Sequence, residues 1–155
     1  MLRALGLDFG EKRIGVAFGD TETKVAVPLG VINRTGTDRD FEAIIRYATS
    51  SEADLIVVGM PRSLGGGKGP QASSVIAFMH QLQQLTRVPI DKWDERFTSV
   101  EADRRLREVQ FKRNPRTSIK NSGRLPRGRQ DSVAASIMLQ AYLDAKEFIP
   151  RSEQR

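Results

Sequence analysis

Three short apolar segments at the start of the chain decide the expected fold. They read A-L-G-L-D-F at 4–9, R-I-G-V-A-F at 13–18 and V-A-V-P-L-G-V-I at 25–32. The spacers between them are short and contain turn residues, which favours antiparallel hairpins over crossover connections. Pro28 cannot donate a hydrogen bond to a neighbouring strand, so we expect the third strand at an edge of the sheet.

The rest of the chain alternates between helical and strand patterns. Apolar spacing predicts helices over 40–47, 73–85, from Thr98 onward and over 131–148, and continuous apolar runs predict strands over 54–59 and 89–93. Asp131 or Ser132 suits the N-cap of the last helix. We therefore expect an α/β fold. Its five-stranded mixed sheet has three antiparallel hairpinned strands, then parallel strands, and is flanked by helices.

Length and composition limit the classes of protein that remain. With 155 residues, the chain predicts a single domain over 1–148 and a short tail at 149–155. There is no cysteine, and His80 is the only histidine, so disulfides and multi-histidine metal sites are impossible. We expect His80 on the surface. No apolar run approaches the roughly 20 residues of a membrane helix. The early acid Asp8 interrupts any signal peptide, so the expected location is the cytoplasm.

The positive charge is concentrated in one window. The chain has a net charge of +6. Residues 104–129 hold ten Lys or Arg and one acid, so the rest of the chain is net negative. A solvated, charge-biased loop is one interpretation, and a polyanionic partner such as nucleic acid is the favoured one. Segments 63–70 and 111–128 are rich in Gly and Pro, and we predict that both are flexible loops.

Three acids stand where strands end or a helix begins. Asp8 closes the first apolar segment, Glu95 follows the fifth strand, and Asp131 opens the last helix. Each has a simpler explanation on its own: a turn for Asp8, a pair with Arg96 for Glu95, and a cap for Asp131. Together, beside a basic window, they predict an all-oxygen site of the kind that Mg²⁺ or Mn²⁺ prefers.

Four motifs in order resemble those of the YqgF family, also called RuvX. They are L-G-L-D-F-G-E-K-R-I-G-V-A at 5–17, I-V-V-G-M-P-R at 56–62, D-E-R-F-T-S-V-E-A at 94–102 and D-S-V-A-A-S-I-M-L-Q at 131–140. The resemblance implies an RNase-H-like fold and a catalytic acid triad matching Asp8, Glu95 and Asp131. It also implies a nuclease that processes the 5′ end of precursor 16S rRNA or cleaves Holliday junctions. Related resolvases carry a fourth acid where this chain has Ala134.

The predicted function is metal-dependent phosphodiester hydrolysis on structured RNA or DNA. Two cations held by the three acids would activate water and stabilise the leaving 3′ oxygen. The basic residues predicted to contact nucleic acid are Lys12, Arg13, Arg62, Arg96, Arg104, Arg105, Lys112, Arg113, Arg116, Lys120 and Arg124. Such contacts position a substrate without reading its sequence.

Three alternatives stay open, together with the oligomeric state. A Holliday junction resolvase shares the same chemistry, and a symmetric four-way junction favours a homodimer. A non-catalytic nucleic-acid-binding assembly factor would keep the fold without turnover. An ATP-using enzyme of the actin and sugar-kinase superfamily shares the strand–Asp–x–Gly opening, but it needs two such domains. The glycine-rich segment lacks the Gly and Ser/Thr positions of a phosphate loop.

Overall fold

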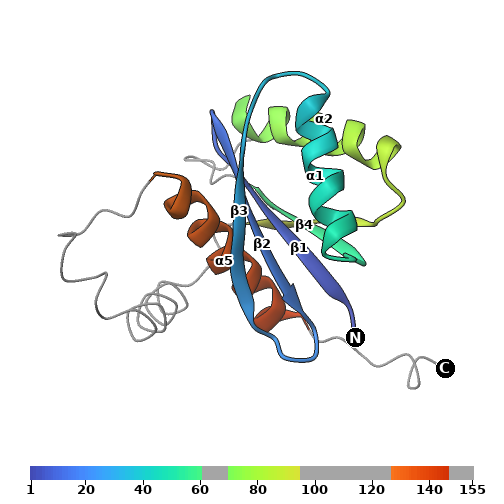
Figure 1. Cartoon of the computed structure of the whole chain (residues 1–155), viewed down its shortest axis with the longest axis vertical. Helices are drawn as coiled ribbons and strands as arrows, with labels where there is room; N and C mark the ends of the chain where they lie inside the picture. Colours follow the sequence, from blue (N-terminus) through green and yellow to red (C-terminus); the bar gives the residue numbers. More distant parts are fainter. Residues whose placement is uncertain (61–69, 95–126, 147–155) are drawn as a thin grey trace.

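The computed structural model describes residues 1–60, 70–94 and 127–146 (Figure 1). Within these ranges the elements follow the order β1, β2, β3, α1, β4, α2, β5 and α5. Their bounds are β1 Arg3–Phe9, β2 Arg13–Asp20, β3 Ala26–Asn33, α1 Arg39–Ser50, β4 Leu55–Met60, α2 Pro70–Leu85, β5 Ile90–Asp94 and α5 Arg127–Ala145. None of the helices in the described ranges has both the length and the apolar character needed to cross a membrane.

One mixed sheet organises the molecule, as the sequence predicts. Its strand order is β3-β2-β1-β4-β5. β1–β2 and β2–β3 are antiparallel hairpins, whereas β1–β4 and β4–β5 are parallel. β3 lies at the edge, which confirms the inference from Pro28. The β2–β3 register shifts between Val16 and Ala17, where Val16 faces Gly30 and Ala17 faces Pro28. A bulge at an edge adds twist and limits pairing with other strands.

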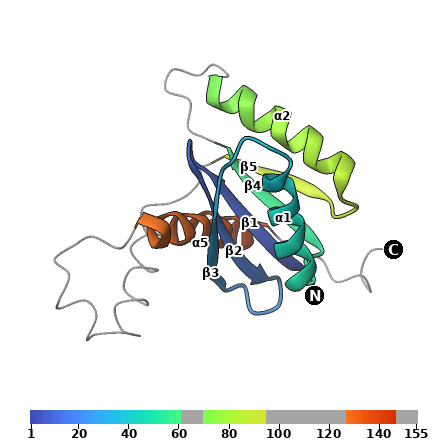
Figure 2. The same cartoon turned by 45° about the horizontal axis from the view of Figure 1, so that its top comes forward.

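Helices α1 and α2 cover one face of the sheet, and α5 covers the other (Figure 2). Beneath α1 and α2 lies a core of branched side chains that includes Leu5, Leu7, Ile14 and Val58. Aromatic rings extend this core to the end of β1. Phe78 stacks on Phe41 with centroids 4.4 Å apart and meets Phe9 edge-on at 4.8 Å. Phe9 anchors the carboxyl end of β1 in the core, immediately after Asp8.

The face under α5 is built from small residues instead. Ala4 and Ala17 are fully buried there, and the glycines of β1 and β2 lie directly beneath the helix. A Cβ atom added at Gly6 would lie 3.0 Å from Leu139 Cβ, and one added at Gly19 would lie 2.9 Å from a Leu143 methyl. The absence of side chains on these glycines allows α5 to approach the sheet closely.

The structure corrects three predicted boundaries. Helix α5 begins at Arg127, not at Asp131 or Ser132, so neither of those residues is its N-cap. Gly128, which the sequence assigns to the flexible loop, is therefore helical. A single glycine costs a helix only about 1 kcal/mol, which the packing of α5 on the sheet outweighs. The helix also ends at Ala145 instead of Phe148. Pro70, assigned to the other loop, begins α2, because proline at a helix start loses no hydrogen bond.

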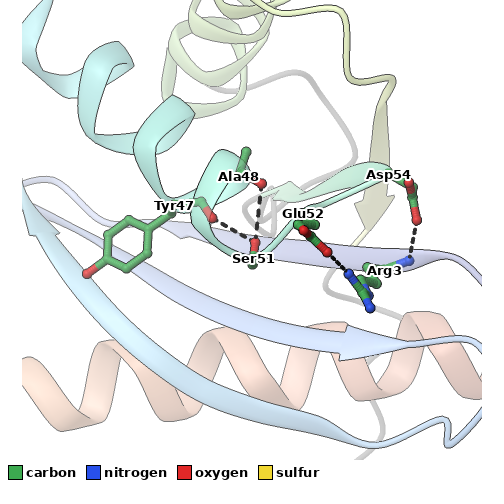
Figure 3. A network of polar contacts seen from close by, with 6 residues as sticks. All are labelled: Arg3, Tyr47, Ala48, Ser51, Glu52 and Asp54. Carbon is green, nitrogen blue, oxygen red and sulfur yellow. Dashed lines mark hydrogen bonds and ion pairs between the residues drawn. The ribbon is translucent and has the colours of Figure 1, made fainter.

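A polar network joins the end of α1 to the beginnings of β1 and β4 (Figure 3). The backbone N–H of Arg3 donates to Asp54 Oδ2 at 2.9 Å, and the N–H of Asp54 donates to the Arg3 carbonyl at 2.7 Å. The Arg3 guanidinium also pairs with Glu52. Ser51 Oγ donates to the Tyr47 carbonyl at 2.7 Å and closes the helix. These contacts set the parallel register of β1 and β4 from the end of the sheet opposite Asp8.

Candidate active site

Asp8 lies near the carboxyl end of the central strand β1, between two glycines on the neighbouring strands. It pairs in register with Gly15 of β2 and with Gly59 of β4. Side chains alternate between the faces of a strand, and Leu7 belongs to the core under α1 and α2. The Asp8 side chain therefore lies on the α5 face. Neither register neighbour places a side chain beside this carboxylate.

Gly15 also places Asp131 beside Asp8. A Cβ atom added at Gly15 would lie 1.9 Å from the carbonyl oxygen of Asp131 and 2.4 Å from its carbonyl carbon. The backbone of α5 at Asp131 thus rests directly on Gly15, the antiparallel partner of Asp8. The sheet and the helix bring two acids that are far apart in sequence against the same glycine.

Arg13 forms an ion pair with Asp131 at this position. Its Nε donates to Asp131 Oδ2 at 2.6 Å, and the two side chains are 32% and 29% exposed. The sequence predicts that Arg13 contacts nucleic acid, and in the structure its guanidinium meets one of the predicted metal ligands. The pair joins the start of β2 to α5.

The turn that follows Asp8 is held by hydrogen bonds from two strands. Gly10 N–H donates to the Arg13 carbonyl at 2.8 Å and closes the β1–β2 hairpin. From the end of β3, Arg34 donates its backbone N–H to Lys12 O at 2.8 Å and its Nη1 to Gly10 O at 2.9 Å. Its guanidinium also lies 5.9 Å from the centre of the Phe9 ring. Lys12 is exposed at the tip of this turn.

Sequence reasoning missed Gly15 and Arg34. The glycine has a weak signal in the sequence, because it interrupts an otherwise apolar strand in R-I-G-V-A-F. Arg34 has none, since a single arginine after a strand is ordinary.

Two further acids serve the fold. Asp40 is buried and accepts hydrogen bonds from the N–H and the hydroxyl of Thr35, both at 2.8 Å, and from Gly36 N–H at 3.0 Å. Burial would raise the pKa of Asp40, but these donors together hold the pKa below its usual value. Asp91 Oδ2 accepts a hydrogen bond from the Tyr142 hydroxyl, with the two oxygens 2.6 Å apart. Burial and this bond raise the pKa of Tyr142 well above its usual value.

All of the remaining predicted site residues lie outside the described part of the chain. The helix predicted from Thr98, most of both predicted loops and the tail at 149–155 lie outside it as well. These site residues are Glu95, Arg62, Arg96, Arg104, Arg105, Lys112, Arg113, Arg116, Lys120 and Arg124. The structure does show that β5 ends at Asp94, which pairs with Met60 one position beyond the register of Asp8. Glu95 is the next residue in the sequence. His80 is exposed on α2, as expected.

The carboxylates of Asp8 and Asp131 suit a hard divalent cation. Asp8 and Asp131 offer carboxylate oxygens, the ligands that Mg²⁺ and Mn²⁺ prefer. No group of three or more potential metal-binding acids or histidines gathers within residues 1–60, 70–94 and 127–146. Of the three acids predicted to bind the cation, Asp8 and Asp131 lie in the described part of the chain, and Glu95 lies outside it.

Solved structures of low sequence identity share this architecture. Thermus thermophilus RuvC in complex with a Holliday junction substrate matches with a TM-score of 0.57 and 11% identity, over 90% of this chain and 92% of that one. The fowlpox virus Holliday junction resolvase matches with a TM-score of 0.53 and 12% identity, over 94% of this chain and all of that one. These likenesses place the chain in the RNase-H-like fold class, as predicted.

The family follows from the sequence comparisons. The model described as "RuvX: Holliday junction resolvase" matches residues 2–145. A relative from Paracoccus denitrificans, named "Putative pre-16S rRNA nuclease", is 39% identical over 148 residues, covering 96% of this chain and 87% of the relative. A Caldanaerobacter subterraneus relative of the same name is 36% identical over 94% of this chain and 99% of the relative. The chain belongs to the RuvX family. It is a nuclease, a hydrolase that acts on ester bonds.

Proposed function

We propose that this nuclease uses Mg²⁺ or Mn²⁺ to cleave structured nucleic acid, and that its substrate is the 5′ end of precursor 16S rRNA. The observation that supports metal dependence most directly is the contact of Asp8 and Asp131 with the same residue, Gly15. The RNA substrate is supported by the names of the relatives, which cover nearly the whole chain. Ribosomal RNA processing also fits the expected cytoplasmic location.

The proposed mechanism assigns the acids to metal binding. Asp8, Asp131 and Glu95 would hold two divalent cations, which activate water and stabilise the leaving 3′ oxygen when bound. Asp8 is well suited to this work because Phe9 anchors the strand end and glycines flank the carboxylate. Lys12, exposed on the adjoining turn, would bind a neighbouring phosphate.

Conservative substitution of the acids tests this assignment. Asp8→Asn, Glu95→Gln and Asp131→Asn preserve side-chain shape and remove charge, so each should abolish cleavage in Mg²⁺ or Mn²⁺ while circular dichroism remains native. Asp38→Asn is the matched control, since Asp38 is exposed and its side chain makes no capping hydrogen bond. Full activity in any of the three site variants would remove that residue from the mechanism.

A Holliday junction is the second candidate substrate, because the matching family model is described as a Holliday junction resolvase. The same preparation should be assayed on precursor 16S rRNA ends, single strands and four-way junctions. Preferred cleavage of the rRNA end supports the first proposal. Symmetric cleavage of the junction supports the second and implies a homodimer. A protein that binds these substrates and cleaves none of them is a non-catalytic assembly factor.

The basic window is proposed to bind phosphates without reading sequence. If four to six of its side chains engage a duplex, the log–log slope of affinity against salt should lie at about −4 to −5. Neutralising Arg113, Arg116, Lys120 and Arg124 together should flatten this slope by about one unit for each phosphate that is no longer bound. Arg46→Gln, an exposed change on α1, should leave the slope unchanged. Binding that is indifferent to salt would contradict this role for the window.

A further inference from the structure

Asp131, one of the proposed metal ligands, forms an ion pair with Arg13. Arg13 Nε binds Asp131 Oδ2 at 2.6 Å, and each side chain is about one-third exposed. A second ion pair, Arg3–Glu52, is more exposed and lies at the far end of the sheet. A short, partly buried, charge-assisted bond of this kind is stronger than an ordinary surface pair.

The backbone of Arg13 is fixed while its guanidinium remains accessible. The Arg13 carbonyl accepts the Gly10 N–H, and Arg13 pairs with Asn33 of β3. The bond to Asp131 uses one of the five N–H donors of the guanidinium. Arginine matches phosphate as well as it matches carboxylate, because its donors form a planar fork. The side chain therefore stands between an acid on α5 and the surface where a substrate backbone would approach Asp8.

We propose that Arg13 is an exchangeable partner of Asp131. While no divalent cation is bound, the guanidinium neutralises the Asp131 carboxylate. When the cation binds this carboxylate, the ion pair breaks and the guanidinium binds a substrate phosphate instead. This inference rests on the proposed metal-dependent function. Its consequence is a coupling between cation and nucleic acid, since each binding event releases one partner of the ion pair for the other.

Electrostatics set the size of the expected effect. The guanidinium competes for Asp131 Oδ2 and repels a cation placed against that oxygen. Each side chain is about one-third exposed, so water screens the repulsion between the guanidinium and the cation and keeps it modest. Removing the positive charge should therefore tighten Mn²⁺ binding by about tenfold.

Calorimetric titration of the full-length protein with Mn²⁺ provides the test. Arg13→Gln keeps an N–H donor and removes the charge, so it should bind Mn²⁺ about tenfold more tightly than the parent. Arg13→Lys keeps the charge and should stay within about threefold of the parent. Arg46→Gln, on the opposite face of the sheet, controls for the loss of one arginine and should not differ from the parent.

A spectroscopic readout on the unsubstituted protein complements the titration. The Nε–Hε resonance of Arg13, assigned by its loss in Arg13→Gln, should shift as Mg²⁺ saturates the site. Unchanged or weaker Mn²⁺ binding by Arg13→Gln, or a resonance that does not move, would overturn the exchange and leave the metal site intact. If the parent binds no Mn²⁺, the proposed metal site fails, and the exchange fails with it.

Discussion

Gly15→Ala is the substitution that tests the construction of the site most directly. The added methyl would lie 1.9 Å from the Asp131 carbonyl oxygen and 3.2 Å from the Ser132 nitrogen. All of the atoms it meets belong to backbone, so no side-chain rotation relieves the overlap. Restoring an ordinary contact of about 3.4 Å requires α5 to retreat from the sheet by roughly 1.5 Å at Asp131.

The expected cost follows from this displacement. Overpacking of a well-packed site costs about 1–3 kcal/mol, and a clash between two backbones belongs at the upper end of that range. For a domain of this size, 3 kcal/mol corresponds to a drop of about 6–12 °C in Tm. Moving Asp131 away from Asp8 by more than about 1 Å should also lower nuclease activity by about 100-fold.

Gly6→Ala is the matched control for this experiment. Gly6 lies on the same face of the sheet and under the same helix, but its added methyl would lie 3.0 Å from Leu139 Cβ and 3.3 Å from Leu139 Cδ2, a much smaller overlap than the 1.9 Å approach at Gly15. We expect a loss of about 1 kcal/mol and nearly full activity. Thermal unfolding and cleavage in Mg²⁺ should be measured for both variants. Equal stability and equal activity of the two variants would refute the inference that α5 rests on Gly15 at the active site.

Three other substitutions probe the fold. Asp40→Asn should lower stability at pH 7 by about 1–3 kcal/mol, because it weakens the three hydrogen bonds accepted at the start of α1. The pKa of Asp40 is lowered by folding, so the parent's advantage should be complete above the unfolded pKa near 4 and fade as pH falls further; equal denaturant curves at pH 7 would contradict this. Tyr142→Phe removes the bond to Asp91 and should cost about 1–2 kcal/mol. The pKa of Tyr142 is raised by folding, so this difference should be present at neutral pH and shrink above about pH 10; a difference that grows there would be inconsistent with the bond. Glu52→Gly should raise stability by about 0.5 kcal/mol, because Glu52 has a φ of 53° and its pair with Arg3 is exposed. A lower Tm would show that the pair matters more than the backbone strain.

The alternating pattern of the chain was sufficient to predict the sheet. Apolar runs report which faces of a strand are buried, and short turn-rich spacers report hairpins. The mixed sheet with its antiparallel hairpins and the edge position of β3 therefore followed from local sequence. The start of α5 did not follow, because Arg127–Gln130 carry no apolar periodicity. Packing of the later turns on Ala and Gly residues of the sheet holds that helix, and this is a property of the tertiary structure.

The candidate site divides in the same way. Asp8 and Asp131 were recognisable from the sequence, because an acid at the end of an apolar strand and another after a basic window are unusual positions. The sequence does not show that both rest against Gly15, or that Arg13 binds Asp131. The contacts of Asp131 with Gly15 and with Arg13 join residues more than 100 positions apart. They depend on how closely α5 approaches the sheet, which local periodicity does not encode and only the packed structure decides.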